Sequence, residues 1–118
     1  TRQTGFNYIP DRHADQRREV TDIGLLALTY YNHGVVRSQK KQYAAALVDY
    51  FRALSLDPEF HSAIQNVLGT VGSWSSDLSA DGEFEQALNV LSMGLRLAPD
   101  DKGMRHNQKV TWQNWAIT

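Results

Sequence analysis

The 118-residue sequence contains no cysteine, three prolines and no apolar run long enough to cross a membrane. The absence of cysteine excludes disulfide bridges, thiolate metal sites and cysteine nucleophiles. The formal net charge is −1, and the densest basic positions, Arg17 with Arg18 and Arg37 with Lys40 and Lys41, fit solvated helix ends. Because a nucleic-acid-binding surface needs a basic patch, we expect no nucleic-acid partner. Because no apolar run has the length of a membrane span, we expect no membrane partner.

Motifs that carry enzyme chemistry are also missing from the sequence. The four histidines, His13, His33, His61 and His106, form no metal-binding pair at helical spacing. The serines around Trp74 lie in no nucleophile elbow, and the glycines form no phosphate-binding loop. We therefore expect no enzyme activity, no cofactor and no metal ion.

The beginning of the sequence differs from the rest. Residues 1–20 have no sustained helical period and are interpreted as a polar leader or linker, whereas residues 21–118 are expected to form one helical domain. The sequence has no signal-peptide pattern at its start. It opens with Thr1 and has no initiator methionine, so we expect a fragment of a longer protein. Targeting information can lie outside such a fragment, so the compartment stays unknown and a cytoplasmic location is only favoured.

Apolar residues recur with a helical period from Thr21 onward and predict an all-α fold. The expected helical segments are 22–38, 42–56, 58–79, 83–97 and 102–116. We expect Thr21 to be the N-cap of the first segment and Pro58 to lie in the first turn of the third. The apolar stripe of the first segment is Ile23, Leu26, Ala27, Tyr30 and Gly34. No alternating β-branched run between turn residues predicts a strand.

Two of these segments repeat one pattern. The sequence YAAALVDYFRALSLDP at 43–58 matches FEQALNVLSMGLRLAP at 84–99. In both, large apolar residues alternate with small ones, which lets a neighbouring helix approach closely. The small positions are Ala46, Ala53, Ala87 and Gly94. A proline closes each unit and starts the next.

This pattern resembles the second helix of a tetratricopeptide repeat, and Tyr30, Gly34 and Pro58 fit the aromatic, small and closing positions of that family. The resemblance covers about residues 27–115. The departures from the family pattern are His33, Arg37 and Lys41. The resemblance implies a right-handed α-α superhelix of antiparallel helical hairpins. The implied units are repeat one at about 27–60, an extended repeat two at about 61–101 and a terminal helix at about 102–116.

The second repeat is longer than the family's repeat, which has a period of about 34 residues. Pro58 and Pro99, which close the two units, are separated by a 41-residue interval (99 − 58). The excess corresponds to about two helical turns and keeps the buried face in register. The extension either presents a surface to a partner or lengthens the packing surface.

The resemblance implies that a peptide or protein partner lies in the concave groove built by the first helix of each hairpin. The matching groove positions are Leu28, Tyr31, Asn32, Val35, Ser62, Gln65, Asn66, Gly69, His106, Asn107, Val110 and Asn114. Asn32, Asn66 and Asn107 recur at one offset, and their amides either bind an extended backbone or bond to neighbouring helices. The family's basic carboxylate-binding positions carry Tyr31, Val35 and Gly103, so charge-driven capture of a peptide is not expected.

Trp112 and Trp115 share one helix face. They either pack inward, or form an assembly face for another chain, which would make a homodimer, or mark a surface for a missing helix. The stretch TDIGLLALTYYNHGVV and the later Asn-x-x-x-x-Trp-x-x-Trp ending resemble helical repeat tails after transglutaminase-like domains of some bacterial proteins. That resemblance implies an accessory or self-assembly domain of a larger bacterial enzyme. The first expectation is a protein–protein interaction module.

Overall fold

The computed structural model describes the backbone of residues 12–118 and the side chains of residues 21–118. In this part of the chain the fold is all-α, as predicted, and contains no strand. The helices are α1 (Arg12–Gln39), α2 (Tyr43–Leu56), α3 (His61–Ala80), α4 (Phe84–Leu97) and α5 (Lys102–Ala116). None of these described helices combines the length and the apolar character that a membrane span requires.

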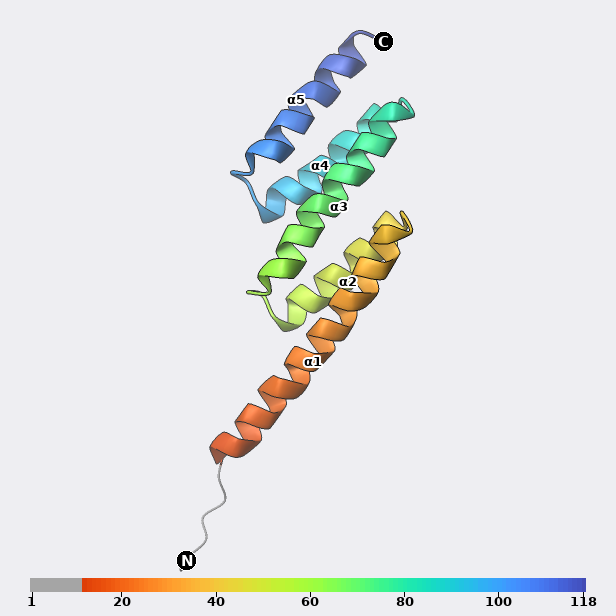
Figure 1. Ribbon diagram of the computed structural model, residues 1–118. Coiled ribbons are helices and arrows are strands. Elements are labelled where there is room, and N and C mark those ends of the chain that lie inside the picture. Colours follow the sequence, from red (N-terminus) through yellow and green to blue (C-terminus); the bar gives the residue numbers. More distant parts are fainter. Residues whose placement is uncertain (1–11) are drawn as a thin grey trace, which may run out of the picture.

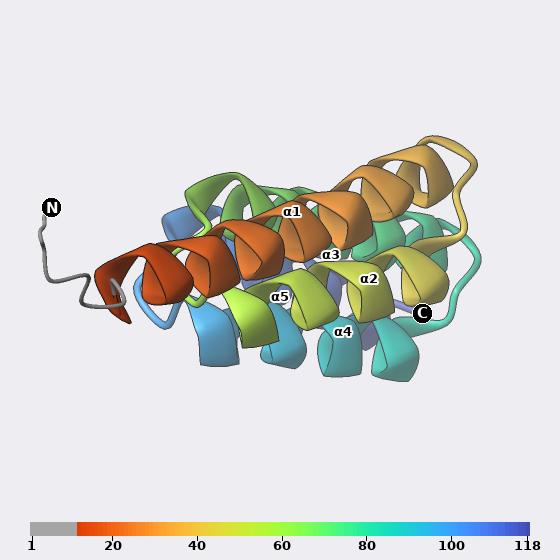
Figure 2. The same ribbon diagram turned by 90° about the horizontal axis from the view of Figure 1, so that it is seen from below.

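The helices form a stack of antiparallel hairpins (Figure 1). Helix α1 pairs with α2, and α3 pairs with α4. Helix α3 also packs on the first hairpin, because it contacts both α1 and α2. Helix α5 packs on the second hairpin in the same way, because it contacts both α3 and α4. The view in Figure 2 shows α1, α3 and α5 in one layer and α2 and α4 in the other. One side of the stack is therefore built by α1, α3 and α5.

The helix boundaries recur at the interval that separates Pro58 from Pro99, which we call the repeat interval. Tyr43 begins α2 and Phe84 begins α4, and the same spacing separates the first residues of α3 and α5 and the last residues of α1 and α3. The extension that the resemblance assigns to the second repeat alone is therefore present in both. The first unit follows this longer interval and not the shorter family period expected for it.

Both hairpin turns have the same backbone geometry. Lys41 and Gly82, which lie one repeat interval apart, are the described non-helical residues with positive φ, at 59° and 78°. In the first turn, the Gln42 N–H donates to the Arg37 carbonyl at 2.9 Å, and the equivalent bond in the second turn is 2.8 Å long. This is the Schellman arrangement, which satisfies free carbonyls at the end of a helix. Lys41 occupies a conformation that favours glycine.

The substitution Lys41→Gly is expected to raise the free energy of unfolding by about 0.5–1 kcal/mol. Glycine removes the left-handed strain of about 1–2 kcal/mol, and its greater freedom in the unfolded chain offsets part of that gain. Urea denaturation of both proteins measures the difference. The reverse change, Gly82→Ala, serves as the control and is expected to destabilise. Equal stabilities for Lys41→Gly and the parent chain would contradict the positive φ at this turn.

The first hairpin closes around Tyr50, whose side chain is 1% exposed. Its ring lies directly on Gly34 of α1, and a Cβ added there would lie 2.6 Å from the Tyr50 Cε1 atom. Glycine at this position lets the ring cross the surface of α1. The ring belongs to the larger of two buried clusters, which consists of Ala46, Leu47, Tyr50, Val67, Val71, Val90, Leu91 and Met104.

We expect Gly34→Ala to lower the free energy of unfolding by about 1–3 kcal/mol, because the added methyl group collides with the buried Tyr50 ring, which must shift to make room for it. The same substitution at Gly24, also on α1, is the control, because nothing lies within 4 Å of the added carbon. Gly24→Ala should stabilise by up to about 1 kcal/mol through helix propensity. Thermal unfolding of the two variants tests the contact, and equal effects of both would contradict it.

The first hairpin also contains an ion pair. Arg37 of α1 donates to the Asp49 carboxylate of α2, whose side chain is 2% exposed, whereas that of Arg37 is 43% exposed. One repeat later the equivalent residues are Leu78 and Val90, which belong to or pack against the larger buried cluster. The same pair of positions is thus an ion pair in the first hairpin and an apolar pair in the second.

The start of α1 differs from the prediction. The helix begins at Arg12, so the interpretation of Thr21 as its N-cap is wrong and Thr21 lies inside the helix. Residues 12–20 include arginine, alanine, glutamine and glutamate, which favour helix without needing an apolar stripe. Periodicity of apolar residues does not detect such a polar segment. The small apolar group of Phe6, Tyr8 and Ile9 in the leader lies outside the described residues.

The start of α3 also differs from the prediction. The helix begins at His61, after Pro58 and not at it. Pro58 lies in a turn in which the Phe60 N–H donates to the Asp57 carbonyl at 3.1 Å. The proline therefore ends the hairpin, but it does not open the next helix.

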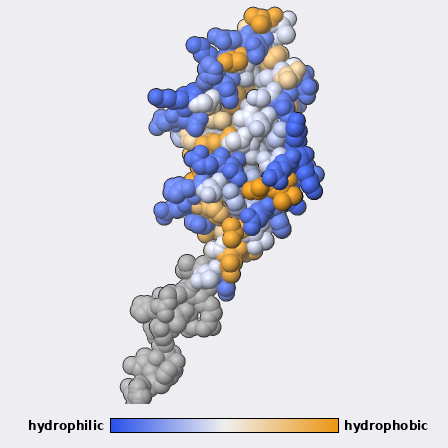
Figure 3. Space-filling view, viewed as in Figure 1, coloured by the Kyte–Doolittle hydropathy of each residue, from blue (hydrophilic) through white to orange (hydrophobic). Residues whose placement is uncertain are grey.

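The apolar stripe expected on α1 is only partly buried. Ala27 and Gly34 are buried, but Ile23 and Leu26 are 43% and 46% exposed. Because α2 has 14 residues and α1 has 28, α2 covers only the second half of α1. Figure 3 shows hydrophobic surface at the end of the stack next to the grey atoms.

Candidate functional site

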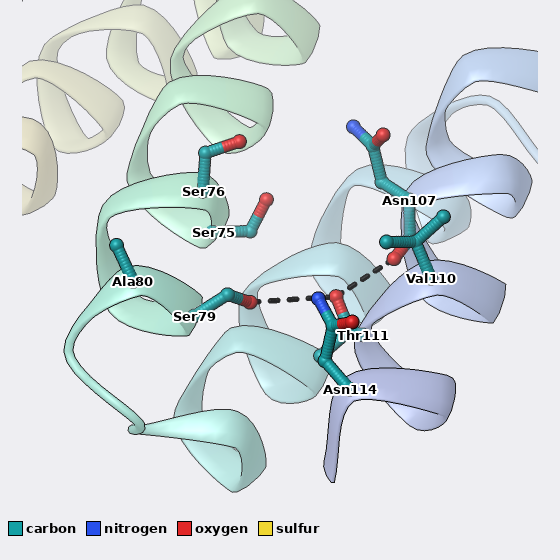
Figure 4. A pocket seen from close by; sticks show the side chains of 8 residues that line it. All are labelled: Ser75, Ser76, Ser79, Ala80, Asn107, Val110, Thr111 and Asn114. Carbon is teal, nitrogen blue, oxygen red and sulfur yellow. Dashed lines mark hydrogen bonds between the residues drawn. The ribbon is translucent and has the colours of Figure 1, made fainter. Parts of the chain in front are cut away.

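Two polar hollows lie along the side of the stack built by α1, α3 and α5. The hollow between α1 and α3 has a volume of about 290 Å³ and is lined by Val35, Ser38, Gln39, Tyr50, Asn66, Gly69, Thr70 and Ser73. The hollow between α3 and α5 has a volume of about 280 Å³ and is lined by Ser75, Ser76, Ser79, Ala80, Asn107, Val110, Thr111 and Asn114 (Figure 4). Both are wide open to solvent.

The two hollows are the same site, one repeat apart. Each lining residue of the α1–α3 hollow, apart from Tyr50, has its equivalent one repeat interval later in the α3–α5 hollow. The equivalence extends to hydrogen bonding, because Ser38 and Thr70 are joined by a contact of 3.2 Å between their hydroxyl oxygens. The equivalent contact between Ser79 and Thr111 is 3.5 Å long. The sequence repeat therefore produces a repeated surface as well as a repeated backbone.

The hydroxyl groups of the α3–α5 hollow have a defined direction of hydrogen bonding (Figure 4). The Thr111 hydroxyl donates its proton to the Asn107 backbone carbonyl at 2.7 Å. Since a hydroxyl group has one proton, Ser79 is the donor in its contact with Thr111. The Ser79 oxygen therefore faces the hollow as an acceptor.

All side chains that line the hollows are uncharged. The one titratable side chain among these lining residues is Tyr50, and no histidine, aspartate, glutamate, lysine or arginine lines either hollow. Within the residues whose side chains are described, no three histidine, aspartate or glutamate residues are grouped as metal ligands. Hydroxyl and amide groups in such a surface suit a neutral ligand that both donates and accepts hydrogen bonds.

The amides of the two hollows differ in their bonding. Asn66 Nδ2 donates to the Tyr31 hydroxyl at 3.2 Å and to the Tyr50 hydroxyl at 3.4 Å. Asn107 and Asn114, by contrast, have no side-chain hydrogen bond to any other described residue. The Asn66 amide therefore bonds to side chains of neighbouring helices, which was one of the two roles expected for it. The amides of the α3–α5 hollow are free to bind a ligand.

Half of the predicted groove residues line the hollows. These are Val35, Asn66, Gly69, Asn107, Val110 and Asn114. The remaining positions lie outside the hollows: Leu28, Asn32, Ser62, Gln65 and His106 are exposed, and Tyr31 is half-buried with its ring 4.9 Å from that of Phe60. The sequence reasoning misses the hydroxyl groups at Ser38, Thr70, Ser79 and Thr111, although their spacing by one repeat interval is visible in the sequence.

The expected ladder of three asparagines has two members. Asn66 and Asn107 occupy equivalent positions one repeat interval apart. Asn32 precedes Asn66 by the shorter family period, and the residue equivalent to Asn66 in α1 is Leu25. The period of the resembled family therefore displaces the first unit by about two helical turns from its true register.

The two tryptophans of α5 are packed on one side and open on the other. The Trp115 ring stacks on Phe84 of α4 at a centroid distance of 6.4 Å, and Trp112 stacks on Trp115 at 5.4 Å. Their exposed fractions are 40% for Trp115 and 54% for Trp112. The pair therefore extends from an interhelical contact to the surface.

Burial raises the pKa of Tyr50 above its ordinary value of 10.0, and the hydrogen bond from Asn66 partly opposes this shift. The hydrogen bond that Tyr43 donates to Asp77 at 2.9 Å raises the pKa of Tyr43 as well. The folded chain therefore holds these protons more tightly than the unfolded chain does.

Stability is expected to fall as the pH rises above about 10. A folded pKa above the unfolded value means that the stabilising contribution is complete below the unfolded pKa and is lost as the pH rises through the folded one. We expect Tyr50→Phe to weaken this dependence, as measured by urea denaturation between about pH 8 and about pH 11. Tyr30→Phe is the control, and an unchanged slope in Tyr50→Phe would contradict the effect of burial.

Comparison with protein-family models, with curated proteins and with solved structures found no match to this chain. The sequence repeat and the two equivalent hollows are therefore the features from which a function is inferred.

Proposed function

We propose that the chain is a protein–protein interaction module of the tetratricopeptide kind that binds an extended, uncharged segment of a partner polypeptide. The observation that carries this proposal is that one neutral hydrogen-bonding hollow occurs twice, one repeat apart, along the side formed by α1, α3 and α5. A polypeptide is a ligand that also repeats, because each residue other than proline presents one N–H and one C=O group.

The free groups of the α3–α5 hollow match the needs of an extended backbone. The Asn107 and Asn114 amides can each donate to a carbonyl and accept from an N–H group. The Ser79 oxygen accepts a further N–H, and Val110 supplies an apolar contact between these polar groups. A side chain of the ligand can lie against Val110 while its backbone is bound on both sides.

The expected energetics are those of a modest, salt-insensitive interaction. A neutral hydrogen bond contributes about 0.5–1.5 kcal/mol net, so a few of them in open hollows give a weak contact at each subsite. Because both hollows belong to one stack of packed helices, a segment that reaches both gains affinity from the second contact without a new association event. The lack of charge in the lining residues removes the usual dependence on ionic strength.

Peptides selected from a random displayed library on the full chain test this proposal. We expect Asn107→Ala and Asn114→Ala each to weaken the selected peptides by about 2–10-fold, which corresponds to the loss of one hydrogen bond of about 0.5–1.5 kcal/mol. Isothermal titration calorimetry measures the change, and affinity should vary little between low and high salt.

Asn32→Ala is the matched control, because Asn32 is an exposed asparagine of α1 outside both hollows. Its affinity for the peptides should equal that of the parent chain. Peptides that lose affinity with Asn32→Ala and keep it with Asn107→Ala and Asn114→Ala would place the site elsewhere and overturn the proposal.

A further inference from the structure

Each complete hairpin has one large residue that packs against a small residue of the following helix. In the second hairpin, Val71 of α3 lies so close to Gly94 of α4 that a Cβ added to Gly94 would be 3.0 Å from the Val71 Cγ1 atom. In the first hairpin, Tyr30 of α1 packs against the smaller buried cluster, which contains Ala53 of α2. Tyr30 and Val71 are equivalent residues, and so are Ala53 and Gly94.

Trp112 is the third member of this series, one repeat interval after Val71. Val71 is fully buried under α4, whereas 54% of Trp112 is exposed. Together with Trp115 and Ala116, Trp112 lines an apolar hollow of about 250 Å³. In both hairpins the residue equivalent to Trp112 lies against the next helix. Within the described part of the chain, no helix lies against Trp112 on this face of α5.

This exposed surface is continuous with an established interface. Trp115 stacks on Phe84 at 6.4 Å and an interplanar angle of 19°, and the equivalent pair, Trp74 and Tyr43, stacks at 6.2 Å and 24°. Helix α5 therefore rests on α4 as α3 rests on α2. The stack of Phe84, Trp115 and Trp112 runs from the half-buried Phe84 ring on α4 to the open face of α5.

We propose that the Trp112 face of α5 binds an amphipathic helix of a partner polypeptide, in the antiparallel position that α2 takes on α1 and α4 takes on α3. The repeat also specifies the chemistry of this helix. It needs glycine or alanine opposite Trp112, as at Ala53 and Gly94, because a larger residue would hold the helix away from the ring. A large apolar residue is required three positions earlier, as at Tyr50 and Leu91.

A second copy of the chain does not supply such a helix. The apolar faces of α2 and α4 are already buried in their own hairpins. The exposed large apolar residues of the uncovered stretch of α1 are Ile23, Leu25, Leu26 and Leu28. Gly24 is the small residue among them, but the residue three positions earlier is Thr21. A partner helix with the α4 pattern therefore fits the face better than α1 of another copy does.

The probe is a fluorescein-labelled synthetic peptide with the sequence of residues 84–97, FEQALNVLSMGLRL, extended by a polar lysine at each end. It is titrated into the full 118-residue chain, and fluorescence anisotropy follows binding. We expect saturable binding that Trp112→Ala weakens at least about tenfold, as is typical of a tryptophan at the centre of an interface. A peptide with the substitution Gly94→Leu should bind at least several-fold more weakly than the original one.

Two control variants of the protein separate this face from other surfaces. Phe51→Ala removes an apolar residue of α2 that is 37% exposed, and it should leave peptide binding unchanged. Asn107→Ala, which is expected to weaken binding of an extended peptide in the α3–α5 hollow, should also leave binding of the helical peptide unchanged. The two proposals can therefore fail independently. Circular dichroism confirms that Trp112→Ala remains folded, as expected for an exposed side chain.

Three results would overturn the inference. The first is equal binding of the peptide to the parent chain and to Trp112→Ala. The second is no binding at any soluble peptide concentration. The third is a dimer of the chain alone, seen by light scattering and lost in Trp112→Ala, which would identify a second copy as the occupant of this face.

Discussion

The close approach of two antiparallel helices at a small residue is the contact on which the rest of the stack depends. Because Gly34 has no side chain, the Tyr50 ring crosses α1 and its hydroxyl reaches Asn66 of α3. One aromatic residue of α2 thereby fixes both its own hairpin and the helix that follows. The α1–α3 hollow has Tyr50 in its wall, so the surface available to a ligand is set by the same packing that stabilises the fold.

The stack presents two surfaces of opposite chemistry. The side formed by α1, α3 and α5 carries hydroxyl and amide groups in open hollows, which suits the backbone of an extended chain. The Trp112 face of α5 is apolar and suits the side chains of a helix. Both surfaces include residues of α5, because Asn107 and Trp112 lie on different faces of this one helix. Ordering of α5 against α4 is therefore a condition for both.

The sequence predicts the all-α fold and the helices α2, α4 and α5 to within one residue, because apolar period and turn chemistry agree at their ends. It predicts α1 and α3 less well. The polar first turns of α1 contain no apolar stripe, and Pro58 marks a turn and not a helix start. Half of the groove residues follow from the family resemblance. The rest escape prediction because the family period displaces the first unit by about two helical turns, and because serine and threonine on a helix give no periodic apolar signal.

The ion pair of Arg37 with Asp49 has a consequence for how the chain finds its correct pairing. Two hairpins of similar sequence can exchange partners while they fold, so that α3 closes on α2 or α1 closes on α4. The first error would bury Asp49 against Leu78, and the second would place Arg37 against Val90. A buried carboxylate without a cation is strongly unfavourable, so the first of these mispaired chains is penalised far more than the second. The ion pair between Arg37 and Asp49 therefore favours the pairing of α2 with α1 over its pairing with α3 as a hairpin partner.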